Sequence, residues 1–110
     1  PFKIHNVYRY KDVVSRMLAK PRPAYKCFPC VAPGWDNSSR KKENGLILVD
    51  STPGYFENWL KTVVDKFEPY SEQENFVFIN AWNEWAEGNH LEPCQKWGRS
   101  YLEAVKLAVK

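Results

Sequence analysis

The sequence predicts an α/β fold, because segments with strand character alternate with segments whose apolar residues recur at helical spacing. The helical pattern is clearest over 10–19 and 53–67, and the four apolar residues at 76–79 have the length of a strand. At 110 residues with 44% apolar content, the chain has the size and composition of one domain. We therefore expect a single unit over 1–110, with parallel strands joined by right-handed crossovers.

The first half of the sequence predicts a helix, a strand and a loop in that order. The segment 10–19 has the helical pattern, and prolines at 21 and 23 end it because proline lacks an N–H donor. Aromatic, β-branched and cysteine residues over 24–32 predict a strand that runs into a turn-forming cluster at 33–37. The polar residues over 38–44 are typical of an exposed loop.

The second half predicts a second helix, a buried strand and a last helix. A short apolar run at 46–49 leads into a helix start at 50–53, where Pro53 suits the first turn, and the helix continues to Phe67. The continuous apolar run at 76–79 is typical of a parallel strand buried on both faces. The last helix is expected from about Trp97.

These elements are too few to close a barrel of eight strands, which needs roughly 250 residues. The sequence therefore predicts the C-terminal two or three βα units of a (β/α)₈ TIM-type barrel. Such a piece would expose apolar surface that the rest of the barrel covers, and this surface would favour self-association.

Charge and hydropathy argue against several classes of partner. The net charge is +3 and the basic residues are scattered apart from Arg40, Lys41 and Lys42, so nucleic acid is not expected. No apolar run reaches transmembrane length and no hydrophobic signal segment is visible, so we expect a cytoplasmic protein.

The three cysteines predict neither a disulfide framework nor a cofactor site. Cys27 and Cys30 have CxxC spacing, but the sequence holds no second such pair and no closely spaced histidine pair. A redox or zinc role is therefore the less favoured reading, and we predict no metal and no cofactor.

Two polar clusters follow predicted strands, where α/β enzymes gather their reacting groups. They lie at 34–37 and at 80–92. The second cluster contains Glu84 and Glu87, and cleavage of an acetal needs an acid and a second carboxylate close together. The spacing i and i+3 lets both carboxylates face one site if the loop turns helically. An ordinary solvated acidic loop is the alternative.

The aromatic content of 15% includes five tryptophans, several of which stand beside polar residues. An aromatic face complements the C–H face of a sugar ring, so these side chains are candidate stacking surfaces. The alternative is that they fill the core.

Three blocks carry a family resemblance: 28–37 with Gly-Trp-Asp-Asn, 51–60, and 78–93 with Asn-Glu-Trp-Ala-Glu-Gly followed by Leu-Glu-Pro. They resemble the WbsX-type glycosyltransferase family of lipopolysaccharide and polysaccharide biosynthesis, whose domain is similar to glycoside hydrolase family 99. The resemblance implies a bacterial (β/α)₈ barrel enzyme that acts on a mannose-like glycan without a metal. The sequence departs from the family at Cys94, where aspartate is more usual.

The resemblance also implies roles for individual residues. Glu84 would be the base that helps the sugar's own 2-hydroxyl attack the anomeric carbon, and Glu87 would be the general acid. The implied substrate contacts are Trp35, Asp36, Asn83, Trp85, His90 and Glu92.

The reaction itself stays open between hydrolysis and transfer. The sequence contains neither an Asp-x-Asp metal motif nor a glycine-rich phosphate loop, so a sugar nucleotide is not supported and hydrolase-like chemistry is favoured. The alternatives are a non-catalytic carbohydrate-binding module, an inactive fragment, and a structural role in which the tryptophans pack in the core.

Overall fold

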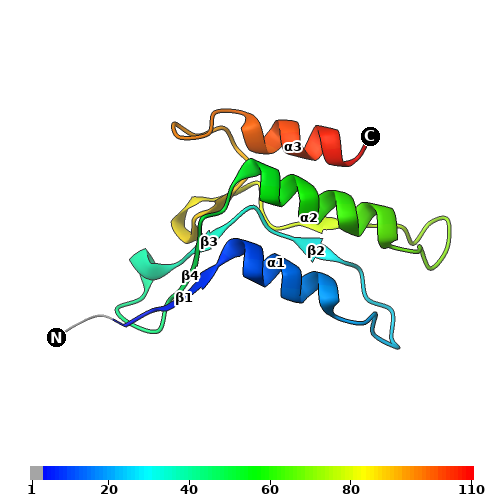
Figure 1. The fold of residues 1–110 in the computed structure, drawn as a ribbon, viewed down its shortest axis with the longest axis horizontal. Helices are drawn as coiled ribbons and strands as arrows, with labels where there is room; N and C mark the ends of the chain where they lie inside the picture. The colour runs from blue at the N-terminus through cyan, green and yellow to red at the C-terminus, as the bar shows by residue number, and fades with distance from the viewer. Residues whose placement is uncertain (1–3) are drawn as a thin grey trace.

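The computed structural model describes residues 4–110 and confirms a mixed α/β fold of helices and small sheets. The helical elements are α1 (Tyr10–Ala19), η1 (Ser38–Arg40), α2 (Pro53–Lys66), η2 (Trp85–Glu87) and α3 (Ser100–Ala108). The strands are β1 (Asn6–Arg9), β2 (Cys30–Val31), β3 (Trp35–Asp36), β4 (Leu46–Val49), β5 (Phe78–Ile79), β6 (Asn83–Glu84) and β7 (Asn89–His90). Figure 1 shows α2 lying between α1 and α3.

The strands form two parallel pairs and two antiparallel pairs. β1 and β4 pair in parallel with Asn6 opposite Leu46, and β2 and β5 pair in parallel with Cys30 opposite Phe78. β3 adds to the other edge of β4 in antiparallel orientation, and β6 and β7 form an antiparallel hairpin. The predicted parallel pairing is therefore confirmed, and within residues 4–110 the strands do not close into a barrel.

Local chemistry explains where the main helices begin and end. α1 spans the residues that the apolar pattern predicted. At the start of α2 the Thr52 hydroxyl accepts a hydrogen bond from the Tyr55 N–H at 3.2 Å, and Pro53 occupies the first turn. Both helices follow directly from neighbouring parallel strands, β1 and β4. They consequently start at the same end of the fold (Figure 1).

The core lies between the helices and the strands. Tyr10, Phe56 and Leu60 are almost completely buried there, and Tyr10 packs edge-on against Trp59 with ring centroids 6.0 Å apart. The Tyr10 hydroxyl donates a hydrogen bond of 2.7 Å to the Ala32 carbonyl, which ties α1 to the segment after β2. Burial raises the pKa of Tyr10 well above its ordinary value, because the phenolate would lose its hydration.

Three predicted features of the secondary structure are wrong, and one strand was missed. The strand β1 was not predicted, the strand expected over 24–32 is reduced to Cys30–Val31, and the last helix begins at Ser100. The run at 76–79 is not buried on both faces, since Phe76 and Phe78 are 51% and 54% exposed. Within residues 4–110, β5 pairs with β2 alone. The outer face of this two-stranded sheet is therefore left without a covering helix or sheet.

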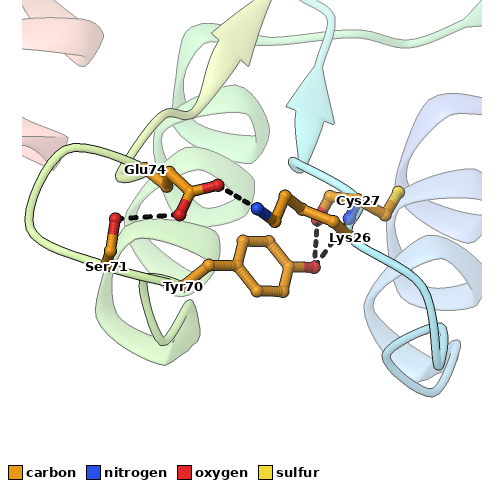
Figure 2. A network of polar contacts seen from close by, with 5 residues as sticks. All are labelled: Lys26, Cys27, Tyr70, Ser71 and Glu74. Atoms are coloured by element: carbon orange, nitrogen blue, oxygen red, sulfur yellow. Dashed lines mark hydrogen bonds and ion pairs between the residues drawn. The ribbon is translucent and has the colours of Figure 1, made fainter.

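The segment before β2 is an ordered loop because side chains anchor it to the loop that follows α2. Figure 2 shows the Tyr70 hydroxyl between the backbone groups of Cys27, accepting from its N–H at 2.7 Å and donating to its carbonyl at 2.9 Å. Lys26 forms an ion pair with Glu74, which also accepts a hydrogen bond from Ser71. The Lys26 and Ser71 hydrogen bonds lower the pKa of Glu74.

Candidate functional site

The two polar clusters predicted from the sequence lie against each other in the structure. The η1 turn contacts the η2 turn, near the end of the fold where α2 begins (Figure 1). The Ser39 hydroxyl donates a hydrogen bond of 3.2 Å to the Ala86 carbonyl. Arg40 Nη1 donates to Glu87 Oε1 at 3.2 Å, forming an ion pair between residues 47 positions apart. The hairpin that carries the candidate acid is therefore held by the loop after β3.

Glycine at position 88 is required by the close approach of these two loops. Gly88 has φ of +56°, and a β-carbon placed there would lie 3.1 Å from Asp36 Cβ and 3.2 Å from the Asp36 backbone nitrogen. Gly34 is similarly close, since its β-carbon would lie 3.1 Å from the Gly88 carbonyl oxygen. Both contacts exclude larger residues without a shift of the backbone.

The side chain of Asp36 stabilises the η1 turn through hydrogen bonds. Its Oδ1 accepts hydrogen bonds from the Ser38 N–H at 3.0 Å and from the Ser38 hydroxyl at 2.6 Å. Asn37 Oδ1 accepts from the Leu46 N–H at 2.7 Å and thereby joins the turn to β4. Asp36 was predicted to contact the substrate. One of its two carboxylate oxygens is already used in holding the loop.

Glu84 and Glu87 lie at the two ends of one short helical turn. Glu84 ends β6, where it pairs with Asn89, and immediately precedes η2, whose last residue is Glu87. The 3₁₀ turn begins only at Trp85, because Glu84 has non-helical backbone dihedrals, with φ of −86° and ψ of 68°. That the two carboxylates face one site therefore stays a prediction. Both side chains are partly buried. Asn83, on the neighbouring position of β6, is exposed and pairs with His90.

Three of the predicted substrate contacts form one compact unit. The rings of Trp85 and His90 stack with centroids 3.6 Å apart and an angle of 14° between their planes. The Trp85 indole N–H donates to Glu92 Oε1 at 3.0 Å, and His90 Nδ1 donates to the Glu92 carbonyl at 3.1 Å. The structure therefore brings Trp85, His90 and Glu92 together.

A small cavity of about 160 Å³ lies beside this unit. It is lined by Trp35, Asp36 and His90, together with Ser51 and Tyr101, whose hydroxyl oxygens are 2.7 Å apart. Burial raises the pKa of Tyr101, more than its contact with Ser51 lowers it. The remaining predicted site residues do not line the cavity; these are Glu84, Glu87, Asn83, Trp85 and Glu92.

Arg40 and Asn89 contribute to the site, although neither was predicted as a catalytic or substrate-binding residue. Arg40 was read as part of a solvated basic loop, although it reaches Glu87. Asn89 is fully buried, and its Oδ1 accepts a hydrogen bond of 3.1 Å from the Ala81 N–H. Asn89 falls within the polar cluster predicted at 80–92, whereas the contact of Arg40 depends on the fold alone.

The described part of the chain offers no arrangement for a bound metal. Among residues 4–110, no three His, Cys, Asp or Glu side chains are placed to hold a metal ion. Cys27, Cys30 and Cys94 are all free thiols. None of the helices in this part of the chain is both long enough and apolar enough to cross a membrane.

Comparison with known proteins establishes the family. The model of the family "Glycosyltransferase WbsX" matches residues 2–105, and the chain belongs to this family. The name of the family points to a carbohydrate-active role of the glycosyltransferase type.

Two curated relatives come from strains of Xanthomonas campestris pv. campestris, and both are called uncharacterized protein WxcX. Each is 36% identical over 105 residues, which is 94% of this chain and 15% of the relative. The chain therefore spans about a seventh of the length of these relatives. No solved structure matches it.

Proposed function

We propose that the chain forms part of the active site of a glycan-processing enzyme, with Glu84 and Glu87 as its acid/base pair. The observation that carries this proposal is the hairpin that holds both carboxylates around a single 3₁₀ turn, beside the half-exposed Trp85. Two carboxylates and an aromatic face are the groups that binding and cleaving a glycosidic bond require.

The roles follow from the family resemblance. Glu84 removes a proton from the 2-hydroxyl of the sugar as that oxygen attacks the anomeric carbon, and Glu87 gives a proton to the departing glycosidic oxygen. Trp35, Asp36, Asn83, His90 and Glu92 complete the surroundings of the substrate.

The proposed setting of this site is a (β/α)₈ barrel acting on a mannose-like glycan in surface polysaccharide or lipopolysaccharide metabolism. Apolar side chains exposed on the strands support the barrel, because neighbouring strands and helices would cover them. They include Val7, Tyr8, Leu46 and Phe78. The same exposed surface favours self-association of the piece alone. Hydrolase-like chemistry is preferred over transfer from a sugar nucleotide because the sequence lacks a phosphate-binding loop.

The test compares Glu84→Gln and Glu87→Gln in the full-length protein, with Glu103→Gln on the exposed face of α3 as the matched control. Hydrolysis of mannosides and binding to a glycan array are measured for each variant. We expect each site substitution to lower turnover by about 10²- to 10⁴-fold while binding is retained, and the control to match wild type. Full turnover in either site variant would refute the acid/base assignment.

A carbohydrate-binding module is the second candidate, favoured by the exposure of Trp82 and Trp85, which are 52% and 49% accessible. Exposed indoles bind sugars without any need for a carboxylate pair. Glycan binding with no turnover in wild type or in any variant would support this alternative over the enzyme.

A further inference from the structure

We propose that His90 acts as a positioning residue, which backs one face of Trp85 so that the opposite face of the indole receives a sugar ring. This inference rests on the glycan-binding part of the proposed function and does not depend on catalysis by Glu84 or Glu87. It assigns His90 a role through Trp85 in place of a direct contact with the substrate.

The stacking geometry shows that one face of Trp85 is covered. The His90 ring lies nearly parallel to the indole at 3.6 Å between centroids, so it covers one face at van der Waals distance. Trp85 is nevertheless 49% exposed, so a large part of the residue outside this contact is open to solvent. A single open aromatic face is the surface against which the C–H groups of a pyranose pack.

The polar edge of Trp85 is already in use. Its indole N–H donates to Glu92 Oε1 at 3.0 Å and is therefore not free to bind a sugar hydroxyl. Trp85 can therefore bind a sugar only through its ring face. The hydrogen bond to Glu92 fixes the rotation of the indole within its own plane. Glu92 keeps its second oxygen for other contacts.

His90 is itself held by the backbone of the hairpin. It pairs with Asn83 across β6 and β7, and its Nδ1 donates to the Glu92 carbonyl at 3.1 Å. The segment that follows is anchored as well, because the N–H groups of Leu91 and Glu92 both donate to the Trp82 carbonyl, at 2.9 and 3.1 Å. An aromatic ring fixed in this way loses little rotational freedom when a ligand binds, and such preorganisation raises affinity.

The experiment compares His90→Ala with His90→Phe in the full-length protein. Phenylalanine keeps a flat ring for stacking but removes both ring nitrogens. Comparing the two variants therefore separates stacking of residue 90 on Trp85 from hydrogen bonding of residue 90 to the glycan. His5→Ala is the matched control, since His5 also makes one hydrogen bond to the backbone, accepting from the Gly45 N–H at 3.0 Å. Affinity for a panel of mannose oligosaccharides is measured in a Glu87→Gln background, which keeps turnover out of the measurement.

We expect His90→Ala to weaken binding by about tenfold, and His90→Phe to restore it to within about threefold of the parent. The emission of Trp85, taken as the difference from a Trp85→Phe variant, should change in His90→Ala and return toward the parent value in His90→Phe. In the active protein, His90→Ala should raise KM with little change in kcat.

Three results would overturn the inference. Equal weakening by His90→Ala and His90→Phe would make His90 a direct hydrogen-bonding contact. Unchanged affinity in His90→Ala would show that His90 has no role in glycan binding. If the parent protein bound none of the oligosaccharides, Trp85 would not be a sugar-stacking surface. Failure of Glu84→Gln and Glu87→Gln to affect turnover would refute the catalytic proposal but leave the binding comparison intact.

Discussion

Replacing Gly88 by alanine should destabilise the protein by more than the same change at Gly98, and the difference measures the contact between the two site loops. Both glycines have φ of +56°, which disfavours an L-residue by about 1–2 kcal/mol. An added β-carbon at Gly98 meets nothing within 4 Å. At Gly88 it would lie 3.1 and 3.2 Å from atoms of Asp36, one of which is a backbone nitrogen that cannot rotate away.

The steric term at Gly88 is an overpacking of about 1–3 kcal/mol. Gly88→Ala should therefore lower the free energy of unfolding by about 2–5 kcal/mol in total, against about 1–2 kcal/mol for Gly98→Ala. The entropy that a glycine-to-alanine change removes from the unfolded chain is the same at both positions and cancels in the comparison.

Urea denaturation followed by tryptophan fluorescence measures both variants, and glycan binding is measured in parallel. We expect Gly88→Ala to weaken binding as well, because the hairpin must move away from Asp36, whereas Gly98→Ala should bind like wild type. Equal losses of stability in the two variants would refute the reasoning, since only the backbone dihedral would then matter.

Two further predictions concern stability. Tyr10→Phe should cost about 1–2 kcal/mol in urea denaturation, because it leaves the Ala32 carbonyl without its 2.7 Å partner, while Tyr25→Phe on an exposed ring should change stability by less than about 0.5 kcal/mol. Folding lowers the pKa of Glu74 from its ordinary value of 4.5, so in this pH range the unfolded chain binds more protons than the folded one. The stabilisation that Glu74 gives the folded state is therefore present above pH 4.5 and is lost as the pH falls through the folded pKa. The stability difference between wild type and Glu74→Gln should accordingly shrink between pH 7 and pH 3, and a constant difference would contradict the linkage to Lys26.

The fold could be predicted from the sequence where a pattern is repeated over several turns. The bounds of α1 and the start of α2 follow from apolar spacing, proline and the Thr52 cap, which are local signals. The strand over 24–32 was wrong because its β-forming residues are used instead to pack Phe28 against a cluster of other aromatic rings and to anchor Cys27 on Tyr70. Strand β1 was not predicted because its four residues form a strand only by pairing with β4, some forty positions away.

The features of the candidate site also fall into those set by local sequence and those set by tertiary packing. The sequence alone determined the family resemblance, the i, i+3 spacing of Glu84 and Glu87, and the positions of the polar clusters after strands, because all of these depend on residues close together in the chain. Only the tertiary structure decided that Arg40 reaches Glu87, that Gly88 lies against Asp36, and that His90 covers one face of Trp85. The first two contacts join residues about 50 positions apart, and the third depends on the register of a hairpin. A linear pattern does not encode such distances, which are set by how the elements pack.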